Sequence, residues 1–167
     1  MISSSLKDLS EIAKFEELKM RVVSYQPDIA QNLGSLIRLC ACFETPLDVI
    51  EPCGFPLSIK ALRRAAMDYA DVADLTKWPS WDNYQQTGPE GRAVLLTTKG
   101  AADLWSFDFA PTDKLILGRE SAGVPQEVSD ACNIRLRIPI SAVTRSLNVT
   151  TAGAIVLAEA KRQEQKM

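Results

Sequence analysis

The feature that most constrains the fold is a repeated switch between strand-like and helix-like spacing of apolar residues along the chain. Strand-like spacing is found at 21–25, 47–51, 72–75, 93–98, 115–118 and 134–138, and helical spacing at 31–43, 58–69 and 147–162, with short helices near Trp81 and Gln126. Strands separated by helices pair in parallel, because each connection must cross back over the sheet. The sequence therefore predicts an α/β domain whose parallel sheet has helices on both faces.

The chain has 167 residues, of which 46% are hydrophobic and 24% charged. A chain of this size buries roughly 70% of its unfolded surface, so one core suffices without disulfides. We expect a single domain over 19–167, preceded by an amphipathic helical extension at 1–18 or, alternatively, a frayed terminal arm. The extension resembles neither a signal peptide nor a transit peptide, and no apolar run is long enough to span a bilayer, so we expect a cytoplasmic protein.

Two features of the composition exclude whole classes of site. The sequence contains no histidine, which excludes catalysis by a Ser-His-Asp triad or a Cys-His pair and zinc sites that use histidine. Its four cysteines lack C-x-x-C spacing, so we expect structural thiols and no metal. The formal net charge of −2 argues against nucleic-acid binding through the whole surface and leaves room for a local basic patch.

A glycine-containing segment, Gly118 to Gly123, lies between a predicted strand and a predicted helix. Ligands of parallel sheets bind beyond the carboxyl ends of the strands, so this turn is a candidate binding loop. Val124 and Pro125 stand where a P-loop requires Lys and Ser or Thr, and the G-x-G-x-x-G spacing of nicotinamide folds is missing. ATP hydrolysis and a common dinucleotide fold therefore lose support.

Two further segments combine polar groups with a predicted helix start. Asn32 and Arg38 share the helix at 31–43, where Arg38 is a functional candidate or a solvated surface residue. Residues 138–148 join a strand end to the last helix and are rich in hydroxyl and amide groups. There Ser146 contributes to a site or simply caps the helix.

Together, these three segments resemble the motifs of the SpoU-type RNA ribose 2′-O-methyltransferases. The matching patterns are Asn-x-Gly-x-x-x-Arg at 32–38, Gly-x-Glu-x-x-Gly at 118–123, and Ile-Pro at 138–139 followed by Ser-Leu-Asn-Val at 146–149. The stretches 50–55, 62–69 and 96–100 resemble the minimal single-domain branch, which methylates the tRNA wobble ribose. The likeness runs from about residue 20 to 162, and residues 1–18 depart from that branch.

The resemblance implies a parallel-sheet Rossmann-like domain with a C-terminal trefoil knot, the SPOUT fold, and S-adenosylmethionine as methyl donor. A knot breaks the usual rule that connections do not thread loops. Matching the motifs position by position implies a set of cofactor-binding residues. These are Leu96, Thr97, Gly118, Glu120, Gly123, Ile138, Ser146 and Leu147.

The implied reaction is methyl transfer to the ribose 2′-hydroxyl of a tRNA nucleotide, the wobble cytidine or uridine. The family points to Arg38, but arginine keeps its proton at neutral pH, so we expect a fork that grips a phosphate and stabilises the developing alkoxide. Asn32 would orient Arg38 or the ribose, and Ser146 and Asn148 would position donor and hydroxyl. Glu120 would brace its loop through backbone amides, unless it is a solvated carboxylate.

For a tRNA substrate, the basic residues near the motifs are either a local patch or dispersed surface charge. Those expected to contact RNA are Arg38, Lys60, Arg63, Arg64, Arg119 and Arg145. One small domain offers little area for a folded tRNA, so we expect a homodimer, with the helix at 147–162 either in the interface or covering the sheet. The alternatives are a non-catalytic RNA-binding or assembly factor that keeps the fold, and an unrelated α/β nucleotide-binding oxidoreductase.

Overall fold

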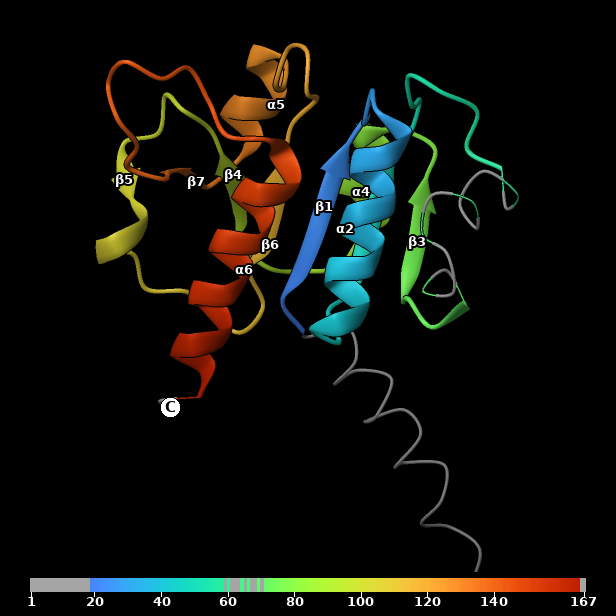
Figure 1. The fold of residues 1–167 in the computed structure, drawn as a ribbon, viewed down its shortest axis with the longest axis horizontal. Helices are drawn as coiled ribbons and strands as arrows, with labels where there is room; N and C mark the ends of the chain where they lie inside the picture. The colour runs from blue at the N-terminus through green and yellow to red at the C-terminus, as the bar shows by residue number, and fades with distance from the viewer. Residues whose placement is uncertain are drawn as a thin grey trace, which may run out of the picture.

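A computed structural model describes residues 19–58, 60, 64, 66, 69 and 71–165. Within these residues, seven strands form one sheet in the order β3-β2-β1-β6-β4-β7-β5, and all its pairings are parallel (Figure 1). The strands are β1 (Arg21–Tyr25), β2 (Leu47–Ile50), β3 (Leu75–Trp78), β4 (Ala93–Leu96), β5 (Ala102–Asp103), β6 (Lys114–Leu117) and β7 (Ile134–Arg137). The predicted parallel sheet is confirmed.

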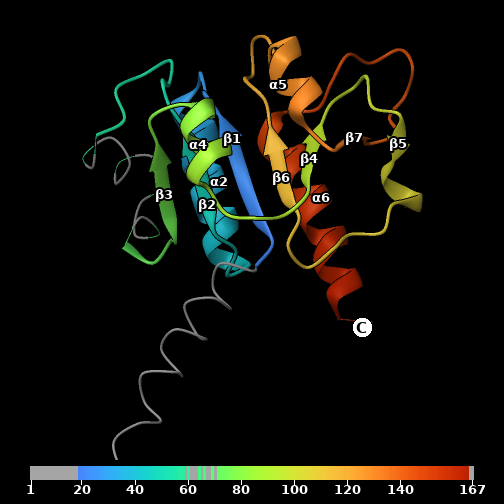
Figure 2. The ribbon, with the colours of Figure 1, turned by 180° about the vertical axis from the view of Figure 1, so that it is seen from behind.

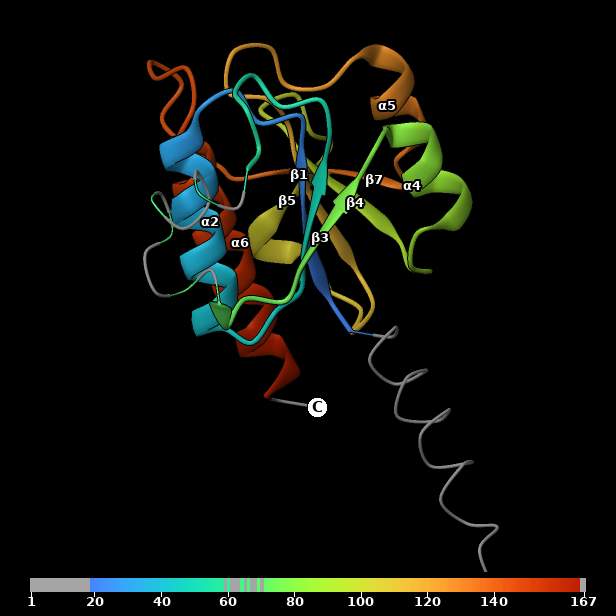
Figure 3. The same cartoon turned by 90° about the vertical axis from the view of Figure 1, so that its right-hand side faces the viewer.

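Helices cover both faces of this sheet, as expected. α2 (Ala30–Cys42) and α6 (Val149–Glu164) lie on one face, and the shorter α4 (Trp81–Thr87) and α5 (Gln126–Ala131) lie on the other (Figures 2 and 3). A single 3₁₀ turn, η2 (Leu104–Ser106), follows β5. The described chain is thus a three-layer α/β/α arrangement.

Alternate residues of the central strands pack into two separate cores. In β1, Val22 faces the α2 and α6 layer and Val23 faces the α4 and α5 layer, both almost without solvent exposure. The predicted apolar stripe of α2 is buried at 1% exposure in each member: Leu33, Leu36, Ile37 and Cys40. Burial of both strand faces explains why the strands read as apolar runs.

The sequence placed the third strand incorrectly. We predicted it near Val72 to Leu75, whereas β3 begins at Leu75 and Val72 is 73% exposed. Pairing with β2 decides the position, since Leu47 lies opposite Leu75 and Ile50 opposite Trp78. The two-residue β5 strand was missed, because two residues are too short to show a period of two.

A buried carboxylate explains that register. Asp48 of β2 has no solvent exposure and accepts hydrogen bonds from Arg21, Trp78 and Tyr84. The indole Nε1 of Trp78 lies 2.9 Å from Asp48 Oδ1, and the hydroxyl of Tyr84 lies 3.0 Å from Oδ2. A buried charge must be paired and hydrogen-bonded, so β3 takes the register that brings Trp78 to Asp48.

Four expectations stay predictions. The extension at 1–18 lies outside the described residues, as does Arg63. The predicted helix at 58–69 is described only at 58, 60, 64, 66 and 69. A trefoil knot forms when one segment of the chain threads through a loop made by another. The order of the strands in the sheet does not test this.

The strand order reverses between β1 and β6. From β1 the chain builds β2 and β3 on one side of the sheet, whereas β6, β4, β7 and β5 lie on the other. Ligands of open parallel sheets bind at the carboxyl edge beside such a reversal, where loops diverge to opposite faces. The loops after β1, β4, β6 and β7 meet there.

Candidate functional site

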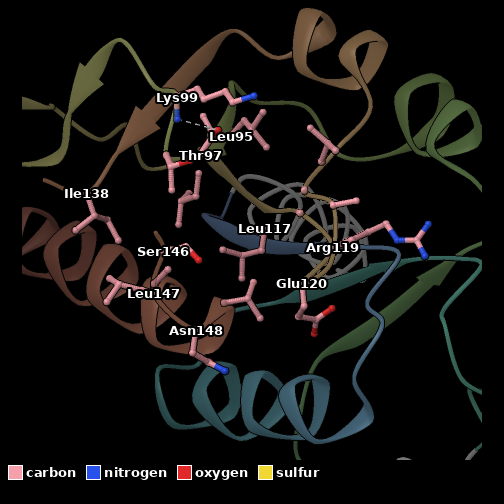
Figure 4. A pocket seen from close by; sticks show the side chains of 18 of the residues that line it. Leu95, Thr97, Lys99, Leu117, Arg119, Glu120, Ile138, Ser146, Leu147 and Asn148 are labelled. Atoms are coloured by element: carbon pink, nitrogen blue, oxygen red, sulfur yellow. Dashed lines mark hydrogen bonds between the residues drawn. The ribbon is translucent and has the colours of Figure 1, made fainter. Parts of the chain in front are cut away.

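A cavity of about 820 Å³ opens at this carboxyl edge (Figure 4). Its walls come from the ends of β4, β6 and β7, from the loops that follow them, and from the first turns of α2 and α6. The volume falls within the roughly 300–1,000 Å³ of small-molecule sites. Apolar side chains such as Leu117 and Ile138 share the lining with backbone and polar groups.

The residues that motif matching marked for the cofactor all line this one cavity. They are Leu96, Thr97, Gly118, Glu120, Gly123, Ile138, Ser146 and Leu147. Figure 4 shows Ile138, Ser146 and Leu147 on the wall opposite Glu120. The motifs did not mark other lining residues, among them Ile29, Lys99, Arg135 and Ile140. Three segments that are far apart in sequence thus line one cavity.

The loop from Gly118 to Gly123 is a tight turn held by its own backbone. The amides of Arg119 and Gly123 each donate to the other's carbonyl oxygen at 2.9 Å. Gly123 has φ +66°, which favours glycine, and a Cβ on Gly118 would lie 2.7 Å from the carbonyl carbon of Gly123. Both glycines are therefore required by the turn's shape.

A second close glycine contact lies next to Leu136, which lines the cavity. A Cβ on Gly100 would lie 2.7 Å from the carbonyl carbon of Leu136, so the loop after β4 rests directly on the β7 backbone. The amide of Thr97 also donates to the carbonyl oxygen of Leu136, at 2.9 Å. This contact keeps Thr97 at the cavity wall.

A hydrogen-bond chain joins the three motif segments. Asn32 Nδ2 donates to Glu120 Oε1 at 3.1 Å, and Asn148 Nδ2 donates to Asn32 Oδ1, also at 3.1 Å. The other carboxylate oxygen of Glu120 accepts from the backbone amide of Asp28 at 2.7 Å. Glu120 is thus engaged at both oxygens rather than being a solvated carboxylate.

Asn148 also caps α6. Its Oδ1 accepts from the amides of Thr150 at 2.8 Å and Thr151 at 3.2 Å, which satisfies two of the helix's free donors. Of the two roles left open for Ser146, capping of this helix is therefore wrong, because the helix begins two residues later than predicted. Ser146 is an exposed residue of the cavity wall.

Sequence reasoning missed Asp28, which lies between β1 and α2. Its carboxylate accepts from Arg119 Nε at 3.2 Å and Nη2 at 2.7 Å through Oδ1, and from Ser121 N at 3.2 Å and Oγ at 2.5 Å through Oδ2. The Arg119 guanidinium and the Ser121 hydroxyl lower the pKa of Asp28 to about 2. An acidic residue just beyond a strand end was the only available signal.

Arg38 is not among the residues that line the cavity of its own chain. It is exposed on α2, with its guanidinium carbon 5.1 Å from the centre of the Tyr69 ring. Among the described residues it has no carboxylate partner, whereas Arg21, Arg119 and Arg162 each have one. Within that part of the chain, no acidic side chain pairs with its guanidinium, and the residue is exposed.

The remaining basic candidates differ in their environments. Lys60, Arg64 and Arg145 are exposed, while Arg119 is paired with Asp28. Figure 4 shows the Arg119 side chain pointing away from the cavity.

None of the four cysteines lines the cavity. Cys40 and Cys132 are buried, and burial raises the pKa of these thiols to about 12 and about 11. Within the described ranges there is no group of three or more residues able to hold a metal ion. No helix of the same residues is long and apolar enough to cross a membrane.

Comparison with known proteins identifies relatives along most of the chain. Residues 19–158 match the SpoU rRNA Methylase family. A tRNA (cytidine(34)-2'-O)-methyltransferase of Beijerinckia indica is 47% identical over 141 residues, which cover 83% of this chain and 88% of that protein.

Solved structures agree with this comparison. One that concerns the 2-OH methylation of C/U34 on tRNA is 36% identical, with a TM-score of 0.83, over 90% of this chain and 99% of its own. The SpoU methyltransferase AviRb from Streptomyces viridochromogenes, in complex with AdoMet, shares the fold at a TM-score of 0.76. It is 24% identical, and the match covers 89% of this chain and 58% of that one.

Proposed function

The chain belongs to the SpoU rRNA methylase family, and from this membership we propose that it transfers a methyl group from S-adenosylmethionine to the ribose 2′-hydroxyl of the wobble cytidine or uridine of a tRNA. The names of its relatives support the reaction and the nucleotide. The observation that carries the proposal is the hydrogen-bond chain from Glu120 through Asn32 to Asn148, because it brings all three motif segments to one cavity.

The cavity suits S-adenosylmethionine in size and in chemistry. An adenine ring needs apolar walls, and Leu117, Leu136 and Ile138 supply them. The polar ribose and amino-acid parts need donors and acceptors, which the backbone of 118–123 and the hydroxyl groups of Thr97 and Ser146 offer. We assign the cofactor to the eight residues predicted from the motifs, all of which lie on this lining.

When bound, S-adenosylmethionine supplies an electrophilic methyl group on a positively charged sulfur. The chain must then hold a ribose hydroxyl in line with that group and stabilise the oxygen as its proton leaves. Arg38 performs the second task in this proposal, as a charged fork that grips the neighbouring phosphate, with the proton passing to phosphate or water. Its exposure on α2 supports this role.

The remaining polar residues hold the reactants. Asn148 positions the hydroxyl, and Ser146, on the adjoining wall, positions the donor. Asn32 links Asn148 to Glu120, which braces the turn through the backbone amide of Asp28. Lys60, Arg63, Arg64 and Arg145 contribute the positive charge that attracts the tRNA backbone.

A homodimer is part of this proposal. Arg38 does not line the cavity of its own chain, and a second copy would bring an Arg38 to each cavity. The segment 139–148, at the cavity mouth, is exposed throughout in the single chain and includes Val143 at 93% exposure. A second copy that covers this segment would remove apolar surface from water.

The test is incubation of the protein with total tRNA and isotopically labelled S-adenosylmethionine, followed by nucleoside mass spectrometry and mapping of the label. We expect 2′-O-methylcytidine or 2′-O-methyluridine at the first anticodon position. RNA affinity should fall steeply with added salt. Binding of S-adenosylhomocysteine and tRNA without methylation would indicate the non-catalytic factor, and binding of NAD without either would indicate an oxidoreductase.

A further inference from the structure

The carboxylate of Asp28 is the anchor of the turn that carries Glu120. One of its oxygens takes two donors from Arg119, and the other takes two donors from Ser121. Its own backbone amide donates to Glu120, the residue between them. Asp28 therefore makes hydrogen bonds to three consecutive residues of the turn, 119–121, through its carboxylate and its backbone amide.

Donor and acceptor chemistry gives the chain beyond Glu120 a fixed direction. Both oxygens of Glu120 accept, so Asn32 must present its NH₂ group to Glu120 and its Oδ1 to Asn148. Asn148 must then present its NH₂ group to Asn32 and its Oδ1 to the amides at the start of α6. Glu120 thus fixes the Asn32 amide at one end of the chain, and the cap of α6 fixes the Asn148 amide at the other.

We propose that Asp28 is a positioning residue for the methyl transfer, acting through Glu120 to hold the Asn32 amide, and with it the hydrogen bond from Asn148, at the cavity. This inference rests on the proposed function for its kinetic consequence. Its structural part is the control of the Asn148–Asn32 hydrogen bond by a residue that does not line the cavity, and it can be tested without a substrate. Arg119 is then the partner that keeps Asp28 charged and in place.

The substitution Asp28→Asn removes this control without changing the side chain's size. An amide has an NH₂ group where the carboxylate has its second acceptor, so this group must face either Arg119 or Ser121. The Arg119 guanidinium and the Ser121 backbone amide can only donate, and the Ser121 hydroxyl would have to turn round to accept. The turn loses contacts on one side, and Glu120 loses its fixed position. Asp28→Glu keeps both acceptor oxygens and serves as the conservative variant.

Asp103→Asn is the matched control. Asp103 receives Arg137 Nε at 2.9 Å and Nη2 at 2.6 Å on a single oxygen, the same arrangement that Arg119 makes with Asp28. It does not line the cavity. This variant also replaces the carboxylate of an exposed arginine–aspartate pair by an amide. It therefore shows how much of any change comes from losing such a pair and not from the position of Asp28.

The first measurement is NMR of the side-chain NH₂ groups of Asn32 and Asn148 in the full-length protein without substrate. We expect both signals to shift in Asp28→Asn and to keep their positions in Asp103→Asn. Unchanged signals in Asp28→Asn would overturn the inference, whatever the protein proves to methylate.

The second measurement is kcat for tRNA methylation in a double-mutant cycle with Glu120→Gln. A small displacement of reacting groups costs on the order of 10- to 100-fold in rate, so we expect a loss of that size in Asp28→Asn and recovery of most of it in Asp28→Glu. Asp28→Asn should add little to Glu120→Gln, because both changes act on one route. Additive losses, or a normal kcat in Asp28→Asn, would overturn the positioning role, whereas inactivity of the wild-type protein on tRNA would overturn the proposed function instead.

Discussion

Asn148 donates a hydrogen bond to Asn32 across 116 positions of sequence, with 3.1 Å between Nδ2 and Oδ1. The same Asn148 side chain caps α6 through its oxygen. One amide therefore connects the start of the last helix to the start of the first described helix. Its two ends have separable tasks, which substitutions can distinguish.

Asn148→Asp keeps the capping oxygen and loses the donor to Asn32, while Asn148→Ala loses both. We expect Asn148→Ala to lower the free energy of unfolding by about 1 kcal/mol, the usual cost of a lost cap, and Asn148→Asp to lower it less. Both should reduce methylation strongly, because both lack the NH₂ group. Urea unfolding and methylation rates measure the two effects, and full activity in Asn148→Asp would contradict the assignment.

Arg38→Lys should fail as a catalyst, because an ammonium is a point charge and cannot replace a planar, two-pronged donor. Arg38→Ala should fail as well. Both variants should keep their affinity for S-adenosylhomocysteine, because the proposal has Arg38 grip a phosphate of the RNA and because Arg38 does not line the cavity of its own chain. Calorimetry and methylation rates check these expectations. Near-normal turnover in Arg38→Lys would count against the fork.

A mixing experiment tests whether Arg38 acts across a dimer. Arg38→Ala and Asn148→Ala are each expected to be inactive alone. If each site combines Arg38 of one copy with Asn148 of the other, co-refolded mixtures should regain part of the activity, because mixed dimers contain one complete site. Continued inactivity, with mixed dimers confirmed by native mass spectrometry, would place Arg38 and Asn148 in the same chain's site.

The two glycines of the turn from Gly118 to Gly123 should differ in how well they tolerate substitution by alanine. Gly123→Ala meets no atom within 4 Å and has only the cost of its left-handed backbone, about 1–2 kcal/mol. Gly118→Ala places Cβ 2.7 Å from the Gly123 backbone, so the turn itself must open. We expect a larger loss of stability and of S-adenosylhomocysteine affinity in Gly118→Ala, measured by unfolding and calorimetry. Equal losses would show that the turn relaxes freely.

The contribution of Asp28 to the free energy of unfolding should decrease at acid pH. Arg119 and then Ser121 lower the pKa of Asp28 to about 2 in the folded chain, whereas the unfolded value is about 3.9. The contribution is complete above the unfolded value and is lost as the pH falls through the folded one. The stability difference between wild type and Asp28→Asn should therefore narrow from about pH 5 to about pH 2. A constant difference in urea titrations would contradict this.

The buried Asp48 should matter more for folding than any exposed pair. Asp48→Ala leaves the guanidinium of Arg21, 7% exposed, without its carboxylate, and removes the acceptor of Trp78 and Tyr84. Breaking a buried pair costs about 3–5 kcal/mol, compared with at most about 1 kcal/mol for an exposed pair such as Arg137 with Asp103. Urea unfolding of Asp48→Ala and Asp103→Asn measures both, and similar losses would be the contrary result.

Local patterns were enough to identify the elements that lie in the interior. Sequence patterns located five strands and one helix within one or two residues: β1, β2, β4, β6, β7 and α2. The strands β1, β2, β4 and β6 are buried on both sheet faces and are therefore mostly apolar, and α2 shows one apolar stripe. The turn from Gly118 to Gly123 was predicted from its glycines and its place after a strand, and the eight candidate cofactor residues came from the resemblance to the SpoU-type family. All eight line the cavity.

Tertiary structure alone decided the contacts between distant segments. The position of β3 depends on Asp48 accepting from Trp78, 30 positions away, and the cap of α6 depends on an asparagine that also reaches Asn32. Only the place of Asp28 just beyond a strand end marked it in the sequence, because its partners Arg119 and Ser121 lie more than 90 positions away. A hydrogen bond requires two groups to lie about 3 Å apart. Folding brings these residues together from distant parts of the chain, so no local sequence pattern can predict the contact.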